Sequence, residues 1–396
     1  MVTTILDIIF LILGSLFSLV LLYLFFLAFA SLWPETRRRQ EFSPAIKFAI
    51  VIPANNESRV IGRALNTVKQ VDYPKNLFDI FVIADNCEDN TAEISRQTGV
   101  MCWERHDPIL RGKGYALHWA FKRLLQEGNH KAFVVVDADT LVDRNFLKAI
   151  NQRILEGAKA IQGYYDVLNP ESSPIGSLSY LGFVISRNLR YKGRTKLGWT
   201  TNLLGNGMCF TREVIQRFGW CATSIVEDIE YEMILLLNDI RIVFAPEAKI
   251  YAEIPDTFSK SKAQRGRWDI GKFEVRNRYL FKLIRKGLKN RDFSYFDSAL
   301  ELIIPPFSLF VMLVLTCYFL FFILDFRGLN LNFYLLTFLL LGLIIYILSG
   351  LILARASLKI YLSLVYAPYF LLWRFWILFQ EIWHRNHRTW IKTVRK

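Results

Sequence analysis

The sequence lacks the two commonest nucleotide-binding loops. No GxGxxG follows its first predicted strand, and GxxxxGK[ST] occurs nowhere in the 396 residues. The five cysteines and five histidines show no paired metal spacing, which argues against a zinc centre. No nucleic-acid-binding module is recognisable, although the formal net charge is +14. We therefore expect no nucleic-acid partner, and any bound phosphate must be held by side chains and a metal ion.

Charge is absent from three long stretches, 8–34, 302–324 and 331–354. Each is long enough to cross a bilayer core, which takes roughly 20 apolar residues. A cleaved signal peptide is the alternative for the first, because the tripeptide AFA near its end resembles a cleavage site. However, the start MVTTILD carries no positive charge, and the apolar core is longer than that of a signal peptide. The sequence therefore predicts three membrane-spanning helices, the first of them retained.

Basic residues at the membrane flanks set the predicted topology. Arg37, Arg38 and Arg39 directly follow the first span, and such residues favour the cytoplasmic side. The centre of the chain is then a cytoplasmic domain, in which the cysteines are expected to be reduced. The predicted division is a transmembrane helix in 1–36, the cytoplasmic domain in 37–275, an interfacial segment in 276–300, two transmembrane helices in 301–356 and a final segment in 357–396.

The final segment differs from the three spans. Its apolar run, 360–373, is shorter than a span needs, and the tail WHRNHRTWIKTVRK is strongly basic. A fourth span would place that tail on the wrong side of the membrane. We expect an interfacial or re-entrant helix followed by a basic cytoplasmic tail. Contact of the flanking basic residues with anionic membrane lipid also accounts for the net charge.

The central domain alternates short apolar runs with helix-like stretches. KFAIVIPA, DIFVIAD and KAFVVVDAD are the clearest strands. This alternation predicts an α/β fold, a mostly parallel sheet with helices on both faces. Ligands of such sheets lie beyond the carboxyl ends of the strands. We expect one crevice there, lined by Asn56, Glu57, Asp85, Asp137 and Asp139.

Two of these acids, Asp137 and Asp139, stand one residue apart after a buried strand. Such a pair can hold a hard cation, Mg²⁺ or Mn²⁺, whose other ligands are water and phosphate oxygens. The alternative is a surface turn in which Asp139 caps the following helix. The other strand-end acids favour the metal site.

Seven motifs follow one another in this domain: VIPANNES, VIADNCEDNT, RGKGYAL, VVVDADT, GNGMCF, SIVEDIE and QRGRW. In this order, and bracketed by membrane helices, they resemble the family 2 inverting glycosyltransferases, similar to the cellulose, chitin, hyaluronan and poly-N-acetylglucosamine synthases. The resemblance covers about residues 45–275. It implies a GT-A type nucleotide-sugar-binding domain embedded between transmembrane helices, a UDP-sugar donor and a divalent metal.

The resemblance also implies roles on the donor side. Asp85 would face the uracil, and Asn56 and Glu57 would hold the nucleoside. Asp139 would be the main metal ligand, with Asp137 beside it in contact with the donor. Lys113 in RGKGYAL would lie near the nucleotide; alternatively, it is a solvated residue at a helix start.

On the acceptor side, the resemblance makes Asp228 the candidate catalytic base, with Glu227 beside it. A carboxylate that takes the proton of a sugar hydroxyl accelerates transfer by about 10²- to 10⁴-fold. The alternative is that both acids only favour the start of a helix through its dipole. Asn206 in GNGMCF is expected near the acceptor, or as a turn residue.

The QxxRW signature consists of Gln264, Arg267 and Trp268. On a helix these three positions share one face. The arginine suits a pyrophosphate, and the indole offers a flat surface to the donor or acceptor sugar. The alternative is a basic amphipathic segment at the membrane surface.

QxxRW is associated with processive members of the family, so the predicted function is the formation of a β-linked poly- or oligosaccharide on a growing saccharide. The alternative is transfer of a single sugar to a lipid acceptor. Because three spans make a wide channel doubtful, export would need a partner subunit or a homo-oligomer. A sugar-binding sensor would not need Asp139, Asp228 and Arg267 together, and a transporter would carry ionisable residues within its spans.

Overall fold

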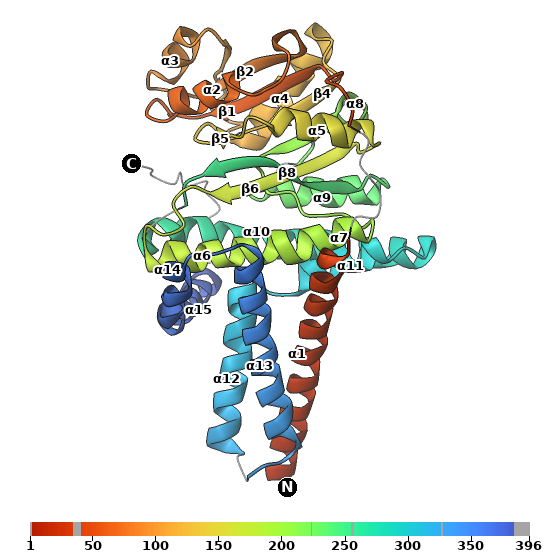
Figure 1. The fold of residues 1–396 in the computed structure, drawn as a ribbon, viewed down its shortest axis with the longest axis vertical. Coiled ribbons are helices and arrows are strands. Elements are labelled where there is room, and N and C mark those ends of the chain that lie inside the picture. Colours follow the sequence, from red (N-terminus) through yellow and green to blue (C-terminus); the bar gives the residue numbers. More distant parts are fainter. Residues whose placement is uncertain (1, 35–40, 223, 255–256, 326–327, 384–396) are drawn as a thin grey trace.

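The computed structural model describes residues 2–34, 41–222, 224–254, 257–325 and 328–383. Figure 1 shows three layers: a sheet domain, a platform of helices beneath it, and three helices that descend from the platform. The basic tail predicted in 384–396 and the arginines at 37–39 lie outside the described residues.

The sheet domain is built on eight strands in the order β3-β2-β1-β4-β7-β6-β8-β5. Four of the strand pairings are parallel and three are antiparallel. The parallel part, β3-β2-β1-β4, contains the strands that the sequence predicted. The strands are β1 (Phe48–Ala54), β2 (Phe78–Asp85), β3 (Met101–Arg105), β4 (Ala132–Val135), β5 (Leu141–Val142), β6 (Ala160–Val167), β7 (Met208–Thr211) and β8 (Ile242–Ala252).

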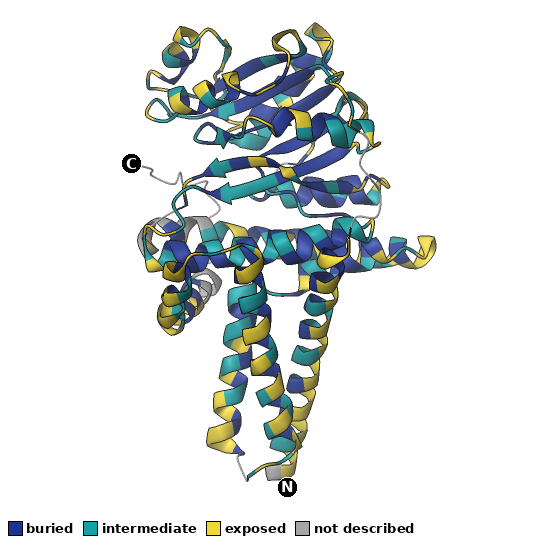
Figure 2. Ribbon diagram, in the orientation of Figure 1, coloured by how far each residue is buried: buried dark blue, intermediate teal, exposed yellow. Residues whose placement is uncertain are grey.

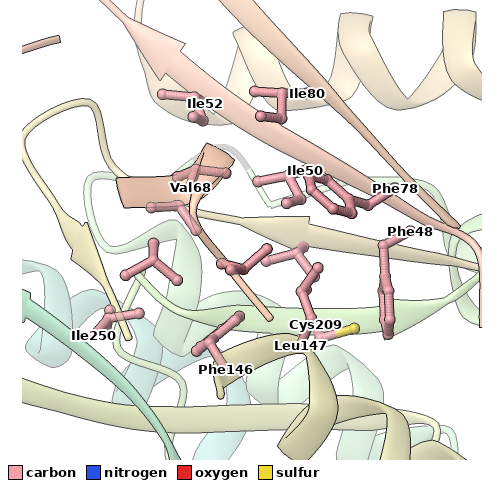
Figure 3. Packing of buried hydrophobic residues seen from close by; sticks show 14 of the residues in the cluster. Phe48, Ile50, Ile52, Val68, Phe78, Ile80, Phe146, Leu147, Cys209 and Ile250 are labelled. Atoms are coloured by element: carbon pink, nitrogen blue, oxygen red, sulfur yellow. The ribbon is translucent and has the colours of Figure 1, made fainter. Parts of the chain in front are cut away.

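Helices cover both faces of the sheet, because alternate residues of a strand point to opposite sides. On β1, Phe48 and Ile50 point to the face covered by α2 and α5, and Figure 3 shows part of this core. Ala49 and Val51 point to the opposite face, which α4, α8 and α9 cover. These helices are α2 (Ile61–Lys69), α3 (Thr91–Gln97), α4 (Lys113–Glu127), α5 (Phe146–Leu155), α8 (Arg212–Phe218) and α9 (Glu227–Leu237), with a 3₁₀ turn at Lys75–Leu77.

The platform lies between the sheet domain and the descending helices (Figure 1). Its longest helix, α10, is continuous, so the predicted boundary at 275 falls within it and marks no break in the chain. The platform consists of α6 (Pro174–Ile185), the π-helix η2 (Ser186–Tyr191), α7 (Lys192–Lys196), α10 (Phe258–Asn290) and α11 (Phe293–Ile303).

The described residues contain four segments long and apolar enough to cross a membrane: Thr4–Leu32, Phe307–Leu324, Leu331–Leu353 and Leu358–Ile377. The first three lie in the descending helices α1 (Val2–Leu32), α12 (Phe307–Leu324) and α13 (Leu331–Leu353). Large apolar side chains stay exposed along them (Figure 2). Such a surface is unfavourable in water and suits a bilayer, which agrees with an integral membrane protein.

The fourth segment is not one continuous helix. It contains α14 (Leu358–Ser363), the 3₁₀ turn Leu364–Tyr366 and the first part of α15 (Ala367–Trp383). In Figure 1 this segment lies beside the platform, near the upper end of α12, and does not follow the descending helices. The interfacial or re-entrant helix of 357–383 therefore stays our prediction.

A buried ionic network joins α1 to the platform. Arg194 bonds to Asp297 at 2.9 Å and to Glu301 at 2.7 Å, and the Tyr23 hydroxyl donates to Asp297 Oδ1 at 2.5 Å. The backbones also approach closely, since a Cβ on Gly193 would lie 2.1 Å from the Leu27 carbonyl oxygen. The first membrane helix is thereby tied to the platform beneath the sheet.

Candidate active site

The two acids of the DAD motif follow β4 at the carboxyl edge of the sheet. Asp137 and Asp139 are half-buried, whereas the intervening Ala138 and the following Thr140 are buried. The Thr140 hydroxyl accepts a hydrogen bond from Asn206 Nδ2 at 2.7 Å. The motif is therefore anchored by its alternate residues, Ala138 and Thr140, and the two acidic residues stay only half-buried.

Lys113 connects three of the predicted site segments. Its Nζ donates to Asp137 Oδ1 and to the Gly205 carbonyl, both at 2.5 Å. Burial lowers the pKa of Lys113, but the charges of Asp137, Glu227 and Asp228 outweigh it, so the net pKa is raised. Lys113 does begin α4, as the alternative expects, but its ammonium group bonds within the carboxylate cluster instead of pointing into solvent. Its place near the nucleotide stays a prediction.

The GNG loop approaches the candidate base. Gly205 has a φ of +74°, and a Cβ on it would lie 3.2 Å from Asp228 Oδ2. The Asn206 side chain accepts from the Asp137 backbone N–H at 3.1 Å. The buried Gln162 fixes the loop from below, donating to the Asn206 carbonyl at 2.8 Å and accepting from the Leu204 N–H at 2.9 Å. Asn206 is thus a positioning residue that aligns the DAD motif.

Glu227 and Asp228 begin α9, next to the same loop. Burial raises the pKa of Glu227 to about 7, and the neighbouring Asp228 charge adds to this effect. Burial also raises the pKa of Asp228, although its Oδ1 accepts from the Ile229 N–H at 2.9 Å. A carboxylate with a raised pKa is a stronger proton acceptor, which suits a general base.

The expected nucleoside-binding residues lie at the ends of β1 and β2. Asp85 pairs with the buried Arg105 at 2.5 Å, and burial raises its pKa although that arginine opposes the rise. The Asn56 side chain, on a residue with a φ of +53°, accepts from the Glu88 N–H at 2.7 Å. Glu57 is fixed through its backbone N–H, which donates to the Thr91 hydroxyl at 2.8 Å. The structure brings these three residues to one edge of the sheet.

The QxxRW segment lies in the first half of α10. Burial lowers the pKa of Arg267, and the nearby Glu227 charge opposes that shift. Trp268 is 43% exposed and lines a cavity with Asp228. Gln264 lies in α10, but its side chain is outside the described part of the structure.

This cavity has a volume of about 380 Å³ and reaches from the candidate base to the membrane helices. Asp228, Ile229 and Trp268 line it on the sheet side, and Phe307 and Val311 of α12 line it on the membrane side. Its volume is within the range of small-ligand sites. An acceptor held here would be next to the carboxylate that must take its proton.

The carboxylates of the DAD motif fit a divalent metal only if a ligand completes its coordination. Within the described ranges, no group of three His, Cys, Asp or Glu residues could hold an ion. Mg²⁺ suits such a site, since it keeps several waters and is bound through one or two carboxylates and phosphate oxygens. The donor set therefore matches an ion that arrives with a diphosphate.

Arg105 and Gln162 are two contributors that sequence reasoning missed. Arg105 ends a strand next to the one that ends with Asp85, and a basic residue opposite a strand-end acid was a usable signal. Gln162 lies within β6 and offers no local signal, because its role depends on the neighbouring β7 and the loop before it.

Comparison with known proteins agrees with this geometry. The model of the family described as "Glycosyltransferase like family 2" matches residues 44–271. The probable glycosyltransferase YdaM of Bacillus subtilis is 26% identical over 64% of this chain and 62% of its own length. The poly-beta-1,6-N-acetyl-D-glucosamine synthase of Staphylococcus epidermidis is 25% identical over 72% of this chain and 68% of its own. This chain thus spans less than two thirds of the Bacillus relative.

A similar fold has been solved in the mannosyltransferase PcManGT from Pyrobaculum calidifontis, in complex with GDP-Man and Mn²⁺. The TM-score is 0.61 at 17% identity, over 92% of this chain and 99% of that one. The likeness confirms the predicted GT-A type fold, to which the described residues add helices long and apolar enough to span a membrane. Because the family model matches more than half of the residues, this chain belongs to glycosyltransferase family 2.

Proposed function

We propose that this protein is a membrane-bound inverting glycosyltransferase that moves a sugar from a UDP-sugar to a hydroxyl of a growing saccharide. The observation that carries the proposal is the meeting of Lys113, Asp137 and Asp228 around Gly205, beside a cavity that Asp228 and Trp268 line. The proposal puts the sheet domain in the cytoplasm, where nucleotide sugars are available.

On the donor side, Asp85, Asn56 and Glu57 hold the nucleoside at the ends of β1 and β2. Lys113 and Arg267 face the diphosphate, since a lysine and an arginine both suit phosphate oxygens. Asp139, with Asp137, would hold Mg²⁺ or Mn²⁺. When bound, such an ion neutralises the charge that develops on the leaving diphosphate.

On the acceptor side, Asp228 removes the proton of the attacking hydroxyl. The new bond to C1 forms as the C1–O bond to the diphosphate breaks, and the nucleoside diphosphate leaves with that electron pair. Attack from the side opposite the leaving group inverts the anomeric carbon, so an α-linked donor gives a β-linked product. Glu227, whose pKa is raised to about 7, lies beside the base and completes the acidic pair.

The similarity to a polysaccharide synthase supports a growing saccharide as acceptor. A second candidate is transfer of one sugar to a lipid. This candidate is favoured because the cavity extends to α12, where apolar side chains such as Phe307 and Val311 line it. In both cases the same base and the same diphosphate site are used.

The test is release of nucleoside diphosphate by the full chain in detergent, with UDP-glucose, UDP-N-acetylglucosamine or GDP-mannose. Each donor is offered with Mg²⁺, with Mn²⁺ and with EDTA. We expect turnover with one UDP-sugar and about a hundredfold loss in Asp139→Asn, because a bound metal contributes several kcal/mol of charge stabilisation. Asp72→Asn, on the surface next to Lys148, is the matched control.

Product length separates the two acceptors, since a polymer ladder supports the growing saccharide and a single added sugar supports the lipid. Exclusive use of GDP-mannose would contradict the UDP-sugar assignment. Equal turnover of Asp139→Asn and Asp72→Asn would show that Asp139 does not hold a metal that the reaction needs.

A further inference from the structure

The cavity beside Asp228 contains an arginine, Arg187, that forms no ion pair with the described residues. Arg187 lines the cavity and is 1% exposed, yet neither its Nη1 nor its Nη2 has a hydrogen-bond partner among the described residues. Burial lowers the pKa of Arg187 more than the nearby Tyr164 and Asp166 raise it. A buried guanidinium group requires hydrogen-bond acceptors, so this side chain is suited to an anion that enters the cavity.

The side chain of Arg187 is held in place although its outer nitrogens have no partner. Its Nε donates to the Phe183 carbonyl at 2.9 Å. The Cζ atom lies 4.8 Å from the Phe183 ring centroid and 5.1 Å from that of Tyr164. The aromatic rings and the Nε bond fix the guanidinium group, which is therefore preorganised for a ligand.

The other charged side chains of the cavity have protein partners. Arg190 pairs with Glu301, and Arg374 pairs with Asp269 at 3.0 Å. Arg265 donates to the Ser179 hydroxyl at 2.6 Å. Arg190 Nε and Arg374 Nη1 also lack a hydrogen-bond partner among the described residues, but each of these arginines is paired with a carboxylate. Arg187 is therefore the position where an external anion would gain most.

Towards the membrane helices the cavity lining is largely apolar, although Arg374 of α15 also belongs to it. Phe307 and Val311 come from α12, Ile347 comes from α13, and Phe370 comes from α15. An inorganic phosphate or a soluble saccharide would leave this end unfilled. An occupant with an anionic head and an apolar chain would match both ends.

We propose that this cavity binds the lipid anchor of the acceptor: a phosphate ester contacts Arg187, and its apolar chain lies against α12 and α15. This inference rests on the proposed glycosyl transfer and names the chemical class of its acceptor. The hydroxyl to be glycosylated is carried on the same lipid and faces Asp228. Its proton passes to Asp228 as its oxygen bonds to C1 and the nucleoside diphosphate leaves.

Gly182 allows the cavity to be filled without disturbing its surroundings. This residue of α6 lines the cavity, and a Cβ on it would meet no atom within 4 Å. A larger side chain at this position therefore starts into open space, and leucine is a better helix former than glycine. Gly182→Leu should fold and block the lipid, whereas Gly182→Ala should have a small effect.

The experiment is native mass spectrometry of the full chain in detergent, titrated with farnesyl phosphate, farnesol, phosphatidylglycerol or inorganic phosphate. We expect one farnesyl phosphate to bind at least about tenfold more tightly than farnesol, since a charge-assisted hydrogen bond contributes at least this much. Arg187→Gln should abolish the preference, Arg187→Lys should retain part of it, and Gly182→Leu should weaken both ligands. Arg63→Gln, at an exposed arginine of α2, is the control.

The outcomes separate the sources of the phosphate. Tighter binding of farnesyl phosphate indicates a prenyl-linked acceptor, and tighter binding of phosphatidylglycerol indicates a glycerolipid acceptor; either supports the site if it depends on Arg187. Equal binding of farnesyl phosphate and farnesol, or displacement of the lipid by equimolar inorganic phosphate, would overturn it.

Failure of the lipid site and failure of the proposed function give different results. Transfer of sugar to a soluble saccharide by a chain that ignores both phosphate lipids would refute the lipid site alone. Binding of a phosphate lipid through Arg187 by a chain that turns over no nucleotide sugar would refute the glycosyl transfer and leave the lipid site standing.

Discussion

The donor side and the acceptor side of this site treat buried charge in opposite ways. Around Gly205, Lys113 bonds to Asp137 and lies near Glu227 and Asp228, so opposite charges compensate one another. In the adjoining cavity, Arg187 is buried more deeply than this half-buried cluster, but the outer nitrogens of its guanidinium group have no partner in the described structure. The comparison indicates a donor side assembled in advance and an acceptor side completed by its ligand.

The two sides also differ in what supports them. The donor cluster rests on the sheet, through the loop that Gln162 fixes. The acceptor cavity rests on helices of the platform and the membrane, joined by the network of Arg194, Asp297 and Glu301. Changes in the membrane part should therefore affect the acceptor side before the donor side.

The largest effect on this comparison is expected from Arg194→Ala. It leaves Asp297 buried without its main counter-charge and Glu301 with Arg190 alone, which costs about 3–5 kcal/mol of unfolding free energy. Arg96→Ala breaks an exposed pair with Glu104, which solvent screens, and should change the unfolding free energy little. Denaturant unfolding of both variants in detergent measures the difference, and similar losses for the two would refute the buried network.

A smaller effect is expected from Gly205→Ala on the donor side. The positive φ of +74° disfavours a side chain by about 1–2 kcal/mol, and the added methyl lies 3.2 Å from Asp228 Oδ2. We expect about a tenfold lower kcat in a protein that still folds, with stability lowered only by that conformational cost. Gly62→Ala on α2 is the control, since its methyl would meet only Ile94 at 3.6 Å. Unchanged turnover of Gly205→Ala would mean that the base does not lie against this loop in the active state.

The smallest effect concerns the pH dependence of stability. The folded pKa of Glu227 is raised from 4.5 to about 7, so the folded state holds the proton more tightly than the unfolded one. This group therefore makes the protein less stable as the pH rises from 4.5 to 7. Glu227→Gln should raise the melting temperature at pH 8 and change it little at pH 4.5.

Thermal unfolding at several pH values checks this last expectation. The exposed Glu88→Gln is the control for the loss of one charge, and it should shift both ends of the profile alike. If the melting temperature of Glu227→Gln varied with pH in parallel with that of the wild type, the pH dependence of stability would arise from a group other than Glu227.

Much of the donor side could be predicted from the sequence, because its residues lie within short motifs at strand ends. Asp137, Asp139 and Lys113 are local signals of this kind, and the structure brings them into one cluster. Arg187 could not be predicted in this way. Its role depends on α6, η2 and the membrane helices meeting around it, and a basic residue in a helical stretch has the same appearance as a solvated one.

The membrane part shows the same limit. The uncharged runs predicted α1, α12 and α13 well, because length and apolar composition are sufficient evidence for such helices. The extent of the platform was harder to predict from the sequence, because α10 continues through the predicted boundary at 275 with polar and apolar residues mixed along it. Its position is decided by packing against α9, α11 and α15, which no local pattern records.

The central claim is that Asp228 is the base between the donor cluster and the acceptor cavity. The measurement that tests it most directly is single-turnover sugar transfer by Asp228→Asn, with nucleotide-sugar affinity measured on the same sample. We predict a rate lower by about 10²- to 10⁴-fold at nearly unchanged donor affinity, because only the proton acceptor is lost. A transfer rate equal to that of the wild type would contradict the account.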